Sequence, residues 1–160
     1  MRPLTIVDSD VSFEAFDDPR VAEALGAPLV KTREAWRASL ERVIAGAPAG
    51  SGTQWHDWTA LLADGTPIGR IEATLHDGIA EIGYVFGPRW WGRGYATEAV
   101  GWLVDEVDRR GWGPCWAAVA PANEASIRLL RRLGFRQRDP GEAALQSFDP
   151  GDLTFVRPSS

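Results

Sequence analysis

Cysteine, histidine and long apolar runs are scarce in this chain of 160 residues. Cys115 is the only cysteine, so neither an internal disulfide nor a cysteine-cluster metal site can form. The two histidines, His56 and His76, are well separated, and we expect both to be half-buried or exposed strand residues that hold no metal. No apolar run approaches the ~20 residues that cross a bilayer, and residues 1–10 lack the pattern of a secretory signal. We therefore expect a cytoplasmic protein without a membrane partner.

An excess of positive charge is also missing. Lysine and arginine together number 17 against 22 aspartates and glutamates, which gives a net charge of −5 and a pI of about 5.0. Non-specific nucleic-acid binding depends on clustered cations that displace phosphate counterions. We therefore expect no nucleic-acid partner. The length suits one hydrophobic core, so residues 1–160 are predicted to form a single domain.

The first third of the chain predicts one strand and two helices. The apolar run at residues 4–7 suits a strand. Asp17-Asp18-Pro19 then opens a helix that Gly26 ends. Thr32 is the predicted N-cap of a second helix. Its apolar stripe is formed by Trp36, Leu40, Val43 and Ile44. Residues 46–52, rich in glycine, read as a loop.

The middle of the chain predicts a three-stranded meander over residues 55–62, 68–75 and 79–86. Asp64-Gly65 and His76-Asp77-Gly78 mark its two turns. On the third strand, side chains alternate between two faces of the sheet. One face carries Ala80, Ile82, Tyr84 and Phe86, and the other carries Glu81, Gly83 and Val85.

Two helices and three strands are predicted after the meander. The first helix has the strongest 3.6-residue periodicity, with a stripe of Ala96, Ala99, Val100, Leu103, Val104 and Val107. A buried strand at 115–119 follows, and Asn123 caps the next helix, which ends at Gly134. Weaker strands are predicted near 135–138 and 153–156. This order predicts a mixed α/β domain, neither doubly wound nor a barrel.

A loop rich in arginine and glycine precedes the strongest predicted helix. It reads Gly87-Pro88-Arg89-Trp90-Trp91-Gly92-Arg93-Gly94-Tyr95-Ala96. A helix N-terminus offers unpaired N–H groups and a partial positive charge, and glycines allow close approach of a ligand. Arg89 and Arg93 can add charge-assisted hydrogen bonds to phosphate. By itself the pattern suits either an anion cradle or a simple chain reversal. It matches neither a Walker loop nor a dinucleotide fingerprint.

Three blocks in order carry a resemblance to a known family. Arg89-Trp90-Trp91-Gly92-Arg93-Gly94 resembles the Q/R-x-x-G-x-G/A signature of GNAT acetyltransferases. Residues 91–99 and 123–135 (N-x-x-S…L-G-F), with Glu81-Ile82-Gly83-Tyr84, resemble the RimJ/RimL-like branch. The resemblance implies the GNAT fold, a mixed α/β (α+β) domain. Its mostly antiparallel sheet of six or seven strands would be splayed between the fourth and fifth strands and flanked by four helices.

The resemblance also implies an N-acetyltransferase that uses acetyl-CoA, without a metal, to acetylate a primary amine by direct transfer. The amine could belong to a protein or peptide N-terminus or to a small molecule, and the enzyme could be a monomer or a homodimer. The pyrophosphate would lie on the amides of about residues 91–97, and the pantetheine arm between strands 79–86 and 115–119. The implied acetyl-CoA contacts are Val85, Phe86, Arg89, Trp91, Gly92, Arg93, Gly94, Tyr95, Ala96, Thr97, Asn123 and Ser126.

Direct transfer needs a base for the protonated amine. Glu81 is the first candidate, because it precedes the loop and Gly83 on the same face leaves room for substrate. Glu72, on a polar strand face, is the second. Either residue could instead be a solvated or salt-bridged strand carboxylate.

The helix after residue 123 supplies the remaining catalytic candidates. Asn123 is a good N-cap, and the resemblance implies that it also contacts the cofactor arm or the acceptor. The tyrosine that many relatives use as the acid aligns with Leu130 here. Ser126 is the implied hydrogen-bond donor to the thiolate, unless it only satisfies the first helical turn. We expect Cys115 to be a core residue and not a nucleophile.

A second class of function is kept open by the missing tyrosine. The chain could be a GNAT-fold domain that binds CoA for regulation or interaction and transfers nothing. Release of free thiol from acetyl-CoA in the presence of amines separates this alternative from a transferase.

Overall fold

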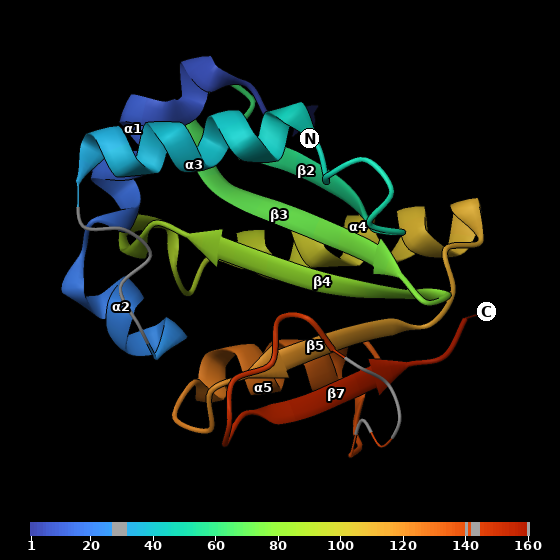
Figure 1. Ribbon diagram of the computed structural model, residues 1–160. Helices are drawn as coiled ribbons and strands as arrows, with labels where there is room; N and C mark the ends of the chain where they lie inside the picture. The colour runs from blue at the N-terminus through green and yellow to red at the C-terminus, as the bar shows by residue number, and fades with distance from the viewer. Residues whose placement is uncertain (27–31, 140, 142–144, 160) are drawn as a thin grey trace.

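The computed structural model describes residues 1–26, 32–139, 141 and 145–159. They form a mixed α/β fold around a mostly antiparallel seven-stranded sheet in the order β1-β2-β3-β4-β5-β7-β6 (Figure 1). The predicted fold class is confirmed, although the described residues form five α-helices where four were expected. The strands are β1 Arg2–Pro3, β2 Gln54–Leu61, β3 Pro67–His76, β4 Ile79–Phe86, β5 Cys115–Val119, β6 Arg136–Gln137 and β7 Leu153–Arg157. The helices are α1 Ser9–Phe16, α2 Pro19–Leu25, α3 Arg33–Ala45, α4 Tyr95–Arg110 and α5 Glu124–Arg132.

The N-terminal segment differs from its prediction. Strand β1 covers only residues 2–3, and the segment predicted as a strand at 4–7 instead enters a 3₁₀ turn, Ile6–Asp8, that leads into the unpredicted α1. The cause is Asp8, whose buried side chain accepts hydrogen bonds from the Thr5 N–H at 3.2 Å and the Thr59 hydroxyl at 2.8 Å. An ion pair with Arg2 completes its surroundings. These contacts turn the chain after residue 5.

Helices α2 and α3 begin at the predicted caps. The Asp18 carboxylate accepts the Arg20 N–H at 2.9 Å, and the Thr32 hydroxyl accepts the Ala35 N–H at 3.1 Å. Trp36 and Leu40 are buried as predicted, in a small cluster with Phe16. The predicted stripe is wrong at Ile44, which is 45% exposed, because the buried side of α3 is formed by Trp36 and Leu40.

The meander β2-β3-β4 has the predicted alternation, with Thr74 opposite Glu81 and Glu72 opposite Gly83. The next pairing decides the shape of the molecule. Strands β4 and β5 run parallel but pair only at Ala80–Cys115 and Glu81–Trp116. Beyond these two pairs the strands diverge toward the end of the sheet where α2 lies (Figure 1). The predicted splay between the fourth and fifth strands is therefore present.

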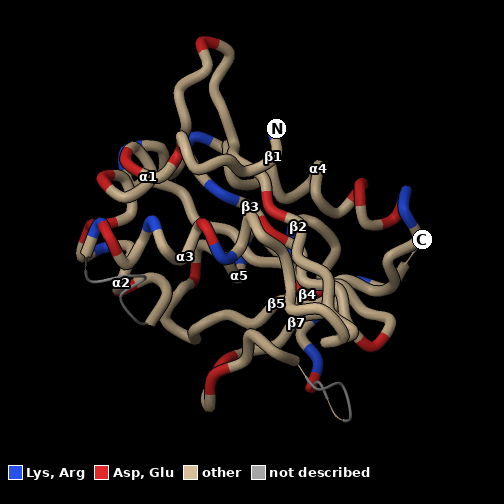
Figure 2. Tube along the Cα trace, turned by 45° about the horizontal axis from the view of Figure 1, so that its top comes forward, with Lys and Arg blue, Asp and Glu red and all other residues tan. Residues whose placement is uncertain are grey.

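Helices cover both faces of the sheet. Helix α4 and helix α5 lie on one face and α1 and α3 on the other (Figure 1). The main core lies on the α4 side, where the predicted stripe of α4 is buried at Ala99, Val100, Leu103, Val104 and Val107. Acidic and basic residues are interspersed along the chain in the view of Figure 2. None of the described helices is long and apolar enough to cross a membrane.

Gly113 is a packing constraint at the start of β5. Its φ is +92°, and an added Cβ would lie 2.1 Å from the carbonyl oxygen of Gly78, at the turn that begins β4. Gly111 also has a positive φ, +64°, in the left-handed region, with open space around the Cβ position. A comparison of alanine substitutions at the two sites therefore separates the cost of backbone strain from the cost of steric contact.

Gly113→Ala is expected to destabilise the protein more than Gly111→Ala. A left-handed alanine costs about 1–2 kcal/mol, and crowding at Gly113 adds about 1–3 kcal/mol. Thermal unfolding followed by circular dichroism measures both. Equal melting temperatures for the two variants would contradict the contact between the turn and β5.

Candidate active site

The divergence of β4 and β5 opens a cleft of about 360 Å³ between β4, the start of α4, α5 and α2, called here the donor cleft. It follows the part of β4 that is no longer paired with β5, and among the described residues none from β5 lines it. Of the predicted cofactor contacts, it is lined by Val85, Phe86, Trp91, Gly92, Gly94, Tyr95, Ala96, Thr97, Asn123 and Ser126.

The loop before α4 has the geometry of an anion cradle. Gly92 and Gly94 have φ values of +72° and +86°, and no atom lies within 4 Å of a Cβ placed at either position. Gly94 is the N-cap of α4, whose first N–H groups have no partner inside the helix. The indole N–H of Trp91 donates to the Phe86 carbonyl at 2.7 Å and fixes the loop to β4. These features suit a bound phosphate group.

The arginines around the donor cleft are not the two that the motif suggests. Arg89 and Arg93 lie over the Trp90 ring, at 5.1 and 5.6 Å from its centroid, and among the described residues neither lines the cleft. Their contact with a cofactor stays a prediction. Arg128 and Arg132 of α5 line the cleft instead. Their four-residue spacing places them on one side of α5, but only the tertiary fold shows that this side faces the loop.

A second cavity of about 240 Å³, called here the acceptor cavity, lies against β3, β4 and β5. Its lining includes Glu72 and Gly83, strand β5 from residue 117 onward, and Ser147, Asp149 and Asp152 from the loop before β7. The residues common to both cavities are Ala24, Leu25, Tyr84, Val85, Asn123 and Ser126. The two cavities therefore meet beside the diverging strands.

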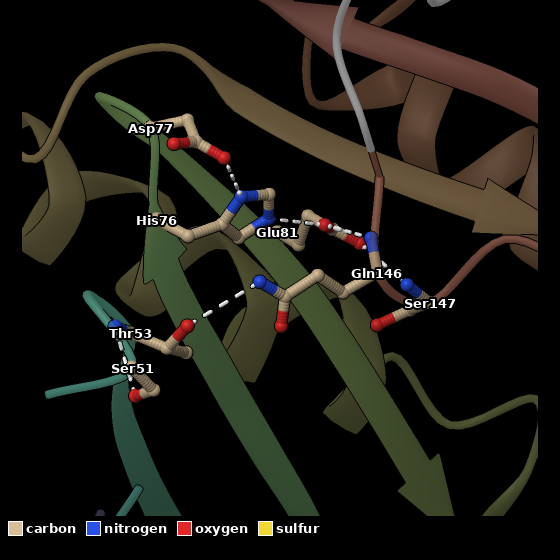
Figure 3. A network of polar contacts seen from close by, with 7 residues as sticks. All are labelled: Ser51, Thr53, His76, Asp77, Glu81, Gln146 and Ser147. Atoms are coloured by element: carbon tan, nitrogen blue, oxygen red, sulfur yellow. Dashed lines mark hydrogen bonds and ion pairs between the residues drawn. The ribbon is translucent and has the colours of Figure 1, made fainter. Parts of the chain in front are cut away.

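Glu81 is buried, at 4% exposure, and both of its carboxylate oxygens are engaged. One oxygen contacts the imidazole Nε2 of His76 and accepts the Gln146 N–H, and the other accepts the Ser147 N–H at 2.9 Å (Figure 3). Among the described residues it lines neither cavity. The geometry assigns Glu81 to anchoring the loop before β7, and its role as the base stays a prediction.

His76 differs from its prediction, because it is buried at the end of β3 and not half-buried or exposed. Burial alone would lower its pKa, but hydrogen bonds to Asp77 and Glu81 outweigh this effect and raise the pKa. The charged imidazole is therefore favoured beside the Glu81 carboxylate.

Glu72 occupies the space that Gly83 leaves. A Cβ on Gly83 would lie 2.7 Å from the Glu72 carboxylate, so the missing side chain makes room for this group and not directly for substrate. The Glu72 side chain is 39% exposed and forms an ion pair with Arg70 at 2.6 Å. Arg70 also binds Asp57, whose pKa burial raises to about 6 despite the nearby guanidinium. Glu72 is thus an accessible carboxylate on the acceptor side.

Asn123 joins α5 to α2 across the mouth of both cavities. Its side-chain oxygen accepts the Ser126 N–H at 3.1 Å, which confirms the predicted N-cap, and its amide donates to the Ala24 carbonyl at 2.8 Å. Ser126 lines both cavities, so its hydroxyl lies where the two meet. Direct contact of Asn123 or Ser126 with a cofactor or acceptor stays a prediction.

Tyr84 is a site residue that the sequence placed only in a strand pattern. Its side chain lines both cavities, and its buried hydroxyl has no hydrogen-bond partner among the described residues. Burial raises the pKa of this hydroxyl to about 12, and the neighbouring Ser126 side chain partly offsets the rise. Tyr84 therefore stays protonated at neutral pH and has a hydrogen bond to give.

Two further residues match their predictions. Cys115 is buried in β5, and burial raises its pKa to about 12, which makes it a poor nucleophile. Leu130 is fully buried in the core beside α4, so no hydrogen-bonding group reaches the cleft from that position. The part of the chain that the structure describes contains no group of three or more His, Cys, Asp or Glu residues able to hold a metal ion.

Comparison with known proteins identifies the family. The model of the acetyltransferase (GNAT) domain family matches residues 1–136. The chain belongs to this family. It is 42% identical over 57 residues to the uncharacterized protein YkkB of Bacillus subtilis, and 42% identical over 62 residues to the uncharacterized N-acetyltransferase p20 of Bacillus licheniformis. These matches cover 35% and 38% of this chain and only 33% and 35% of the relatives, about a third of their length.

Solved structures share the fold over nearly the whole chain. RimL, a ribosomal L7/L12 alpha-N-protein acetyltransferase in complex with coenzyme A, superposes with a TM-score of 0.77 at 17% identity, covering 99% of this chain and 92% of its own. An acetyltransferase from Agrobacterium tumefaciens gives 0.69 at 27% identity, covering 98% and 88%. The aminoglycoside acetyltransferase AAC(6')-Ib in complex with coenzyme A gives 0.75 at 20% identity, covering 98% and 92%.

Gly92→Val or Gly94→Val is expected to abolish CoA binding more than it lowers stability. Valine is strained at positive φ and fills the space that a phosphate would occupy. Titration calorimetry with CoA and thermal melting measure the two effects. Gly50→Val, at φ +78° in a remote loop with the same open surroundings, is the matched control. Wild-type CoA affinity in either loop variant would show that the cradle lies elsewhere.

Proposed function

We propose that this chain is an N-acetyltransferase of the RimJ/RimL-like branch that moves an acetyl group from acetyl-CoA directly to a primary amine. One observation carries the proposal: a cleft that starts at a helix N-terminus meets a second, carboxylate-lined cavity beside two diverging strands. This arrangement suits two substrates that enter from opposite sides. The enzyme would act in the cytoplasm, as a monomer or homodimer.

The donor cleft fits acetyl-CoA in charge and shape. The open Cβ positions of Gly92 and Gly94 leave the amides of residues 91–97 accessible to the pyrophosphate, and Arg128 and Arg132 supply positive charge nearby. The pantetheine arm would lie along the unpaired edge of β4. RimL and AAC(6')-Ib were solved with coenzyme A, and a phosphinothricin acetyltransferase from Sinorhizobium meliloti with AcCoA, which supports the same donor here.

Acetyl-CoA supplies an activated thioester carbonyl. The protein has to remove one proton from the amine and stabilise the departing thiolate sulfur. Glu72 is the proposed base, because it is the accessible carboxylate that lines the acceptor cavity next to Gly83. It would take a proton from the ammonium form of the acceptor, directly or through water. Ser126 is the proposed hydrogen-bond donor to the departing sulfur, because it lines both cavities. Asn123 would hold α5 and α2 around the meeting point.

The acceptor is proposed to be a primary amine. The similar structures include acetyltransferases whose descriptions name ribosomal protein, aminoglycoside and spermidine, so the fold alone does not choose among amines.

Purified protein mixed with acetyl-CoA and a panel of amines is expected to release free thiol only when an amine is present. A thiol reagent follows the rate, and mass spectrometry identifies the acetylated product. A protein that binds CoA tightly but releases no thiol with any amine would be a CoA-binding regulatory domain instead. If the purified protein does not bind CoA, both the transferase and the CoA-binding regulatory domain are ruled out.

Glu72→Gln is expected to lower kcat roughly 100-fold, because the amide cannot accept the proton. Glu81→Gln is the matched comparison, and it is expected to lower the melting temperature and raise the acceptor KM through the loosened loop, with a smaller loss of kcat. The opposite pattern, a stable Glu81→Gln protein with lost kcat and an active Glu72→Gln protein, would restore Glu81 as the base. Steady-state kinetics and thermal melting distinguish the two outcomes.

A further inference from the structure

The two cavities carry opposite charge. The charged side chains that line the donor cleft are Arg128 and Arg132, as a polyanionic donor requires. Those that line the acceptor cavity are Glu72, Asp149, Asp152 and Arg70. Among the residues that the structure describes, the acceptor side therefore contains three carboxylates for one guanidinium.

The single cation of the acceptor cavity is already neutralised. Arg70 forms ion pairs with both Asp57 and Glu72, and Asp57 stands outside the cavity lining. Asp149 and Asp152, in contrast, form no ion pair within the described ranges of the chain. Two carboxylates at this cavity are thus left for a cation that enters from solvent.

The loop that carries these two carboxylates is fixed in place. The Asp149 N–H donates to the Asp152 carboxylate at 3.2 Å, and the Asp152 N–H donates to the Asp149 carbonyl at 3.0 Å. A few residues earlier, the loop is held to β4 by the Glu81 carboxylate (Figure 3). The Gln146 side chain also donates to the Thr53 hydroxyl at 3.3 Å. Glu81 holds the loop at residues 146 and 147, and the pairing of Leu153 with Val119 holds its other end. Glu81 therefore acts as a positioning residue for the two carboxylates.

A second observation at the same cavity does not depend on charge. The Tyr84 hydroxyl is buried where the donor cleft and the acceptor cavity meet. The Ser126 side chain is its polar neighbour, but the hydroxyl proton has no acceptor within hydrogen-bond distance among the described residues. A buried polar group left unpaired costs about 1–3 kcal/mol. A ligand that places a hydrogen-bond-accepting atom at this junction removes the cost. The cavity therefore has a polar inner end at Tyr84 and an acidic outer end at Asp149 and Asp152.

We infer that the acceptor is a small, slender amine that carries a second cationic group, and that Asp149 and Asp152 bind this second group. The reacting amine then lies at the inner end, near Glu72 and Tyr84, and the distal cation lies at the loop before β7. The small cavity favours such a molecule over a bulky one. This inference rests on the proposed transferase function and narrows its acceptor class.

The test compares α,ω-diamines of increasing chain length with amino alcohols of the same lengths, in which a hydroxyl replaces the distal ammonium. The full-length protein is expected to show a lower KM for the diamine of best length than for its amino alcohol, with similar kcat. Because the distal contact is electrostatic, added salt is expected to raise the diamine KM more than the amino alcohol KM. Equal KM values for every matched pair would overturn the inference.

The double variant Asp149→Asn with Asp152→Asn tests the proposed contact. Asparagine keeps an oxygen for the Asp149 N–H, so the loop structure is expected to survive. The diamine KM is expected to rise roughly three- to tenfold, and the amino alcohol KM is expected to rise less, because only the diamine has a distal ammonium. Asp105→Asn, the same change on an exposed position of α4, is the control. An equal KM rise for both acceptor types, or none, would contradict the assignment.

A third measurement separates this inference from the proposed function. Thermal shifts of the protein with CoA and each diamine or amino alcohol report binding without turnover. Larger stabilisation by the diamine supports the inference even if turnover is slow. Equal thermal shifts with diamines and amino alcohols, together with thiol release, would reject the requirement for a second cationic group but support the transferase function. Absence of thiol release with every amine would reject the transferase itself.

Discussion

The short parallel pairing of β4 with β5 determines where every other part of the site can lie. Two residue pairs hold the strands together at one end, and beyond them the backbone groups of both edges lack a strand partner. An unpaired strand edge is open to pairing by any extended polar chain. Helix α4 begins beside this opening, and α2 and α5 are tied across it by Asn123. The separation of two strands therefore creates the donor cleft and joins it to the acceptor cavity.

Two carboxylates on the same face of the sheet have different roles because of their neighbours. Glu81 is buried against His76 and two backbone amides, and its hydrogen bonds position the loop before β7. Glu72 lies next to Gly83, where the absent side chain leaves its carboxylate partly exposed. A buried, fully hydrogen-bonded carboxylate contributes to structure, whereas an accessible one can exchange protons with a substrate. The loop that Glu81 anchors also brings acidic groups to the cavity that Glu72 lines.

Charge separates the two substrates across the narrow region where the cavities meet. Arginines of α5 line one side and carboxylates line the other, so in the proposed reaction an anionic donor and a cationic acceptor would each be attracted to its own cavity. Tyr84 and Ser126 lie between them and offer hydroxyl groups without net charge. This division follows from the fold, because β3 is far in the sequence from both α5 and the loop before β7.

The sequence by itself determined the meander, the caps at Thr32 and Asn123, and the glycine-rich loop and helix that follow β4. Each of these depends on residues close together in the chain, such as a side chain that caps its own helix or alternating residues on one strand. Local patterns did not reveal the turn at Asp8, which depends on Thr59, or the positions of Arg128 and Arg132. Local patterns also predicted that Gly83 leaves room for substrate. Register across the sheet places Glu72 opposite Gly83, and the Glu72 side chain takes that space. Only the tertiary structure decided which carboxylate is anchored and which is accessible, since burial and hydrogen bonding depend on segments that meet only in the folded chain.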